Sequence, residues 1–127
     1  MITMLKKLIG PIRYMTEEFE DKVASGMKYL SHAGHPVQSI GELRIANHLY
    51  DNGIPYIYDT PMRVGKDILR PDFVLPDSGM IIEFKGMDTE EYNKKFERKL
   101  NIYAKSGHEV LIVHPQGLEQ VKKLLSR

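Results

Sequence analysis

Two apolar segments joined by a tight turn place the strongest constraint on the fold of this chain. Residues 68–75 and 80–86 are rich in Ile, Leu, Val and Phe, and the sequence between them, at 76–79, reads PDSG. Pro, Asp and Gly are the residues that tight turns prefer, so the pattern predicts a β-hairpin. Four charged residues, Arg70, Asp72, Glu83 and Lys85, lie within these otherwise apolar segments, and a hairpin fixes which of them face one another.

Hydrophobic periodicity predicts the other elements. Apolar residues at three- and four-residue steps predict helices over residues 16–30, 39–50, 89–105 and 118–125, with a short amphipathic segment before Pro11. Asp88 is the expected cap of the third of these helices. Composition predicts strands at 55–61 and 108–114, and the apolar run 110–113 is expected inside the sheet. The resulting order, α, α, β, β, β, α, β, α, predicts an α/β fold whose mixed four-stranded sheet is flanked by helices.

Length and composition are those of one globular domain over residues 1–127. The chain is 42% hydrophobic and 28% charged, has a formal net charge of +1 and contains no cysteine. The lack of cysteine excludes disulfides, thiolate zinc sites and a cysteine nucleophile, and it favours a reducing compartment. No signal peptide and no bilayer-spanning apolar run is recognisable, so we expect a cytoplasmic protein without a membrane partner.

The charged residues of the hairpin point to a metal site. Side chains alternate along a strand, so Glu83 and Lys85 share one face, while Ile82 and Phe84 share the other. The hairpin register brings Asp72 close to Glu83, and two close carboxylates repel one another unless a cation lies between them. Oxygen ligands favour Mg²⁺ or Mn²⁺. For the Glu83–Lys85 pair taken alone, a plain ion pair is the alternative interpretation.

The same residues resemble a family signature. Pro71-Asp72, ten intervening residues and then Glu83-Phe84-Lys85 are similar to the motif of the PD-(D/E)xK nuclease superfamily. Its members share an αβββαβ, restriction-endonuclease-like core, which corresponds to the element order predicted here. The resemblance implies a nuclease core at 37–115, an N-terminal helical extension at 1–36 and a C-terminal helix at 116–127. The segment 39–59 also resembles small nuclease domains of phages, mobile elements and helicase proteins, which implies a prokaryotic, archaeal or viral origin.

The resemblance implies a role for each residue of the cluster. Asp72 would be the central metal ligand, Glu83 the second ligand and the backbone carbonyl of Phe84 a third. Glu42, in an S-x-x-E capping box on the first core helix, would bind directly, through water or at a second ion. Lys85 would orient the attacking water and stabilise the phosphate. The implied protein is a metal-dependent DNA endonuclease that hydrolyses phosphodiester bonds with metal-activated water.

A basic segment, residues 93–105, extends this interpretation to DNA binding. Lys95, Lys99 and Tyr103 follow at four-residue steps and share a helix face, so we expect them to contact the DNA backbone. Some exonuclease branches of the superfamily place Gln-x-x-x-Tyr on this helix. Lys99-x-x-x-Tyr103 lacks the glutamine, which counts against an exonuclease. A solvated basic face, with Tyr103 in the core, is the alternative.

Other functions remain open at this stage. The minimal core also resembles Holliday-junction resolvases, so branched DNA is an alternative substrate, and cutting two strands would require a homodimer. Restriction-type or transposon-end cutting is equally open. A different class is a nucleic-acid-binding module that has lost catalysis, and a third is a toxin or partner-binding domain. The pair His32-x-x-His35 is set aside as a metal site, because no third ligand lies near it in the sequence.

Overall fold

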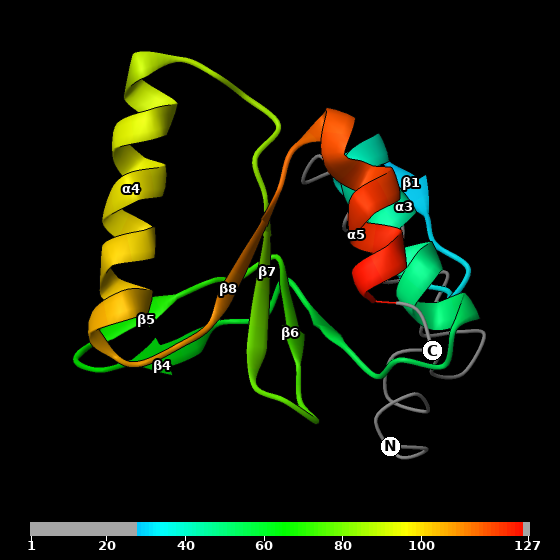
Figure 1. The fold of residues 1–127 in the computed structure, drawn as a ribbon, viewed down its shortest axis with the longest axis horizontal. Coiled ribbons are helices and arrows are strands. Elements are labelled where there is room, and N and C mark those ends of the chain that lie inside the picture. Colours follow the sequence, from blue (N-terminus) through cyan, green and yellow to red (C-terminus); the bar gives the residue numbers. More distant parts are fainter. Residues whose placement is uncertain (1–27, 126–127) are drawn as a thin grey trace. The chain divides into compact units, whose positions relative to one another are not determined.

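The computed structural model describes residues 28–125, which form a mixed α/β structure (Figure 1). The chain divides into two compact units. The first comprises residues 1–56 and 118–127, and the second comprises residues 57–117. None of the helices described in 28–125 has the length and apolar character needed to cross a bilayer.

The first unit combines a small hairpin with two helices: β1 (Tyr29–Leu30), β2 (Pro36–Val37), α3 (Ile40–Asp51) and α5 (Leu118–Leu124). β1 and β2 pair antiparallel. The helix expected over 16–30 is therefore wrong at its end, because the Ser31 N–H and hydroxyl groups donate to the His35 carbonyl oxygen and close a turn there. The start of that expected helix and the segment before Pro11 lie outside the described residues.

The second unit contains a four-stranded mixed sheet, a separate hairpin and one long helix. Its elements are β3 (Ile57–Tyr58), β4 (Met62–Val64), β5 (Asp67–Leu69), β6 (Phe73–Leu75), β7 (Met80–Phe84), α4 (Glu90–Lys105), β8 (Val110–Val113) and a 3₁₀ turn, η1 (Pro115–Gly117). The strand order is β3-β6-β7-β8. β6 pairs antiparallel with β3 and β7, whereas β7 and β8 are parallel, with α4 as the crossover between them.

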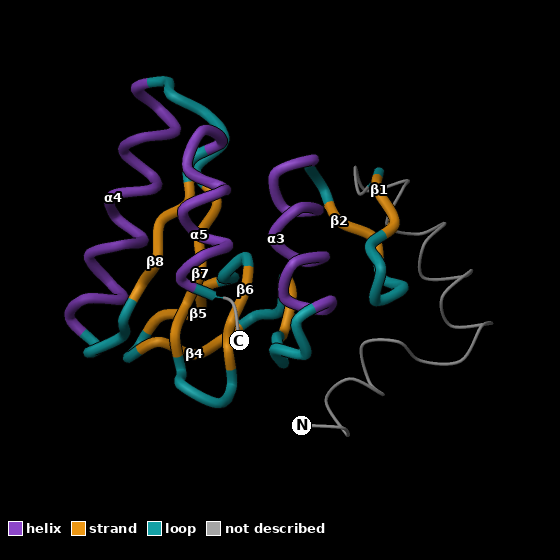
Figure 2. Tube along the Cα trace, turned by 45° about the vertical axis from the view of Figure 1, so that its right-hand side comes forward, coloured by secondary structure: helices purple, strands orange, loops and turns teal. Residues whose placement is uncertain are grey.

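The predicted hairpin is confirmed. β6 and β7 pair on either side of the 76–79 turn, with Phe73 opposite Ile82 and Leu75 opposite Met80 (Figure 2). The next positions along the two strands are Asp72 and Glu83. The register of the hairpin therefore brings the two acids to neighbouring positions, as the sequence indicated.

Three predicted strands differ from the observed ones. The expected strand 68–75 is two strands, β5 and β6, because Pro71 has no N–H group to donate to a ladder, and β5 pairs instead with β4. The strand expected at 55–61 is shortened to β3. β8 is the last strand in the sheet order rather than an inner one, and Ile112 is 37% exposed. The apolar composition of residues 110–113 favours a buried strand, but it does not determine which strands pair with it.

Helix α4 lies beside the sheet, with the β4–β5 hairpin near its C-terminal end (Figure 1). It begins one residue later than expected, because Thr89 rather than Asp88 is the cap, and the Thr89 side chain accepts the Tyr92 N–H. Its inner face is apolar. Tyr103 packs in a buried cluster with Val64 of β4 and Ile81 of β7, and this cluster joins helix, hairpin and sheet.

Candidate active site

Asp72 occupies the break between β5 and β6. The Phe84 N–H group donates to Asp72 Oδ2 over 2.7 Å, so the carboxylate itself satisfies a backbone donor of β7. The Asp72 carbonyl oxygen meanwhile accepts the Asp59 N–H at 3.0 Å, which links the same residue to the chain just after β3. The acid directly before β6 is thus held on one side by β7 and on the other by the residue that follows β3.

Glu83 is almost completely buried, with 2% of its side chain exposed. Two residues of α4 donate to the same oxygen of this carboxylate. The Tyr103 hydroxyl group lies 2.8 Å from Glu83 Oε2, and Lys99 Nζ lies 2.7 Å from it. A buried charge is tolerated where it is paired and hydrogen-bonded, and these two contacts supply both conditions.

The two acids lie at facing positions of the hairpin, because the pairing of Phe73 with Ile82 places Asp72 and Glu83 next along the two strands. Burial raises the pKa of Tyr103 far above its usual value of 10.0, and the negative charges of Glu83 and Asp72 raise that pKa further.

Lys85 directly follows β7, two residues after Glu83. Its N–H group donates to the Val113 carbonyl oxygen at 2.8 Å and continues the pairing with β8. Its ammonium group lies 5.9 Å from the centre of the Phe96 ring, on α4. Glu83 also reaches α4, so the side chains of Glu83 and Lys85 both contact this helix, and Asp72 binds the backbone of Phe84 between them.

Glu42 belongs to the first unit, near the start of α3. Ser39 is confirmed as the cap of this helix, and Glu42 reaches back to the Ser39 hydroxyl group rather than to its N–H group. The Glu42 N–H group donates to Ser39 Oγ at 3.2 Å, and the Ser39 hydroxyl group donates to Glu42 Oε2 at 2.8 Å. The described contacts of Glu42 are thus those of a buried helix start, and its participation in the site belongs to the proposal below.

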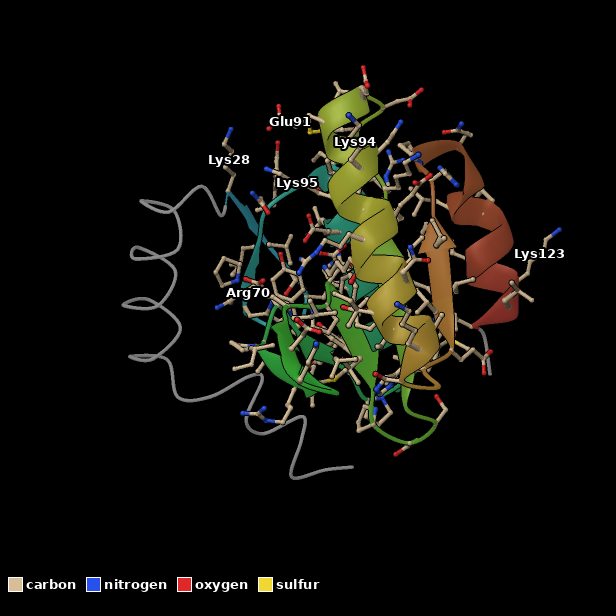
Figure 3. The ribbon with its side chains drawn as sticks, turned by 90° about the vertical axis from the view of Figure 1, so that its left-hand side faces the viewer. Lys28, Arg70, Glu91, Lys94, Lys95 and Lys123 are labelled. Carbon is tan, nitrogen blue, oxygen red and sulfur yellow. The ribbon has the colours of Figure 1, made fainter. Side chains whose placement is uncertain are left out.

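The three residues expected to contact DNA have different environments. Lys95 has 79% of its side chain exposed and lies 3.6 Å from the Glu91 carboxylate. Tyr103 is 0% exposed, which corrects the expectation that it lies on a DNA-contacting surface. Lys99 is directed toward Glu83. Figure 3 shows the outward side of α4, where Lys94 lies in front of the helix and the sheet lies behind it.

Sequence reasoning therefore missed that Lys99 and Tyr103 are partners of Glu83. A signal was present. A buried strand acid needs compensation, and two residues one helical turn apart on the following crossover helix can reach a single carboxylate. The four-residue repeat of Lys95, Lys99 and Tyr103 instead predicts one DNA-contacting face, because lysines usually mark solvated surfaces.

The donor set fits a hard divalent ion. Asp72 and Glu83 offer carboxylate oxygens, and the Phe84 carbonyl oxygen, which accepts the Tyr92 hydroxyl group at 3.4 Å, offers a third oxygen. Across residues 28–125, no three His, Asp or Glu side chains are gathered as a metal cluster. Mg²⁺ nevertheless requires only one or two carboxylates, because water completes its octahedral shell.

No protein-family model, curated protein or solved structure matches this chain.

Proposed function

We propose that the protein is a Mg²⁺- or Mn²⁺-dependent DNA endonuclease with a restriction-endonuclease-like core. The observation that carries the proposal is the placement of Asp72 and Glu83 at facing positions of the β6–β7 hairpin, with Lys85 two residues after Glu83. Two neighbouring carboxylates can hold a divalent ion, and a nearby lysine can stabilise the charge of a phosphodiester under attack. The order of elements from α3 to β8, with β6 and β7 as a hairpin and α4 as the crossover, supports this core.

Each residue of the chain has a distinct task in the proposed reaction. Asp72, Glu83 and the Phe84 carbonyl group would hold the ion, and the family resemblance implies Glu42 as a further ligand. A bound divalent ion lowers the pKa of water and screens the charge between phosphate and carboxylates. Lys85 donates hydrogen bonds to the attacking water or to the phosphate oxygens, and its positive charge stabilises the additional negative charge of the transition state.

The geometry makes Asp72→Asn a precise test of the site. Asparagine keeps a side-chain oxygen that can accept the Phe84 N–H, so this variant should fold, but it removes the negative charge from the metal site. We expect cleavage to fall by at least about a hundredfold. Asp77→Asn, in the exposed turn at the other end of the same hairpin, is the matched control and should cleave like the wild type.

The substrate panel should contain linear, nicked, forked and four-way DNA, each incubated with Mg²⁺, Mn²⁺ or a chelator. Metal-dependent cleavage that Asp72→Asn abolishes supports the proposal, and preferential cutting of four-way DNA would assign a resolvase. Cleavage that is unaffected by Asp72→Asn would contradict the site. Quantitative binding to DNA without cleavage under either metal would contradict the enzyme.

A nucleic-acid-binding module without catalysis is the second candidate. One observation favours it: the Lys99 ammonium group already lies 2.7 Å from Glu83 and offsets a charge that a metal ion would otherwise neutralise. The same panel separates the two functions, because a binding module retains DNA in a mobility-shift assay and releases no cleaved product.

A further inference from the structure

The ammonium group of Lys99 is held by two oxygen atoms in the candidate site, as a small cation would be. Its ammonium group lies 2.7 Å from Glu83 Oε2 and 2.8 Å from the carbonyl oxygen of Arg70, two residues before Asp72. Only 25% of its side chain is exposed. The group thus has two oxygen partners, one charged and one neutral, and it contacts the acid that the proposed function assigns to a metal ion.

The other lysines near the start of α4 are paired differently. Lys94 lies 3.3 Å from Glu90 and Lys95 lies 3.6 Å from Glu91, both as exposed pairs four residues apart on the helix. Such pairs contribute little to stability and do not orient another element. Lys99, by contrast, links α4 to Glu83 of β7 and to the backbone before β6.

Tyr103 restricts the same oxygen. Its hydroxyl group donates to Glu83 Oε2 at 2.8 Å, one helical turn beyond Lys99. Both donors from α4 therefore use Oε2, and neither uses Oε1. With both donors on Oε2, Glu83 can still offer Oε1 to an ion. Coordination through both oxygens would require Oε2 to lose its hydrogen bonds to Lys99 and Tyr103.

We propose that Lys99 is a positioning residue that holds Oε2 of Glu83 and thereby limits the site to a single divalent ion. With its ammonium group and the Tyr103 hydroxyl group both on Oε2, Glu83 would offer only Oε1 to a divalent ion. This inference rests on the proposed function, because it concerns how that same site binds metal. It assigns Lys99 to the metal site rather than to a DNA-contacting surface.

The test is a calorimetric titration of the full chain with Mn²⁺ in the absence of DNA. The variants are Lys99→Met, which removes the charge but keeps a long side chain, and Lys99→Arg, which keeps the charge. Lys95→Met is the matched control on the exposed side of α4. Circular dichroism verifies folding, and Lys99→Gln replaces Lys99→Met if the latter does not fold.

We expect one Mn²⁺ per wild-type chain. Lys99→Met should bind Mn²⁺ about tenfold more tightly or take up a second ion, because a positive charge a few ångströms from the ion is removed. Lys99→Arg and Lys95→Met should resemble the wild type. Unchanged stoichiometry and affinity in Lys99→Met would overturn the inference while leaving the proposed metal site intact.

Failure of the proposed function gives a different result. If the wild-type chain takes up no Mn²⁺, the metal-dependent mechanism is contradicted. Lys99→Met then tests the inference separately. If this variant binds Mn²⁺, Lys99 excludes ions from Glu83, as inferred. If neither the wild-type chain nor Lys99→Met binds Mn²⁺, both the proposed function and the inference about Lys99 are overturned.

Discussion

Replacement of Tyr103 by Phe removes one hydroxyl group from the centre of the second unit and leaves the ring in place. That hydroxyl group is buried and donates to the Glu83 carboxylate at 2.8 Å. Hydrogen bonds to charged groups contribute about 1.5–3 kcal/mol to stability. We therefore expect the free energy of unfolding to fall by that amount, which corresponds to a decrease in Tm of roughly 6–11 °C for a chain of this size.

The measurement is urea unfolding followed by circular dichroism, with a thermal melt as a second readout. Tyr92→Phe is the matched control. Its hydroxyl group donates to the Phe84 carbonyl oxygen at a long 3.4 Å, so its removal should cost less than about 0.5 kcal/mol. Equal stability of Tyr103→Phe and the wild type would refute the argument that this contact compensates a buried charge.

Three further predictions concern pH and backbone conformation. Burial is the main reason that the pKa values of Tyr103 and Tyr56 are raised in the folded chain, so the unfolded chain releases these protons first as pH rises past 10.0. The free energy of unfolding, measured in urea, should therefore fall above pH 10.0, and a constant value up to pH 11 would contradict this. Burial lowers the pKa of His35 below 6.5, so the unfolded chain binds the proton first and stability should fall as pH decreases below that value. His35→Gln should weaken this acid sensitivity in urea titrations, and an unchanged sensitivity in this variant would contradict the assignment to His35. Gly65→Ala should lower the free energy of unfolding by about 1 kcal/mol or more in the same assay. Gly65 has a φ of 62°, and an added Cβ would lie 3.3 Å from Ser106 Oγ. An unchanged free energy of unfolding would contradict this prediction.

The parts of the fold that the sequence predicted well are those with local signals. The start of α3, the long helix α4 and the β6–β7 hairpin each have a cap, a periodic apolar face or a turn sequence that acts over a few residues. The facing positions of Asp72 and Glu83 were predictable for the same reason, since a short turn fixes the register of the two strands that it joins.

The incorrect predictions depended on contacts between distant segments. Tyr29–Leu30 has helical spacing upstream but pairs with Pro36–Val37 as a strand, and β5 separates from β6 because β4 competes as its partner. The pairing of Lys99 with Glu83 is likewise tertiary. Its sequence separation is large, and only the docking of α4 on β7 selects Lys99 over the other lysines of the helix.

The attachment of Glu83 to α4 makes strand and helix interdependent at a single oxygen atom. A ligand that binds Glu83 Oε2 must weaken the contacts of this oxygen with Lys99 and Tyr103 of α4. By thermodynamic reciprocity, a movement of α4 alters the affinity of Glu83 for that ligand. A spectroscopic label at Lys94, on the outward side of α4, would consequently sense events at Glu83 without touching it (Figure 3). The crossover helix thus serves as a reporter of what happens at the acid.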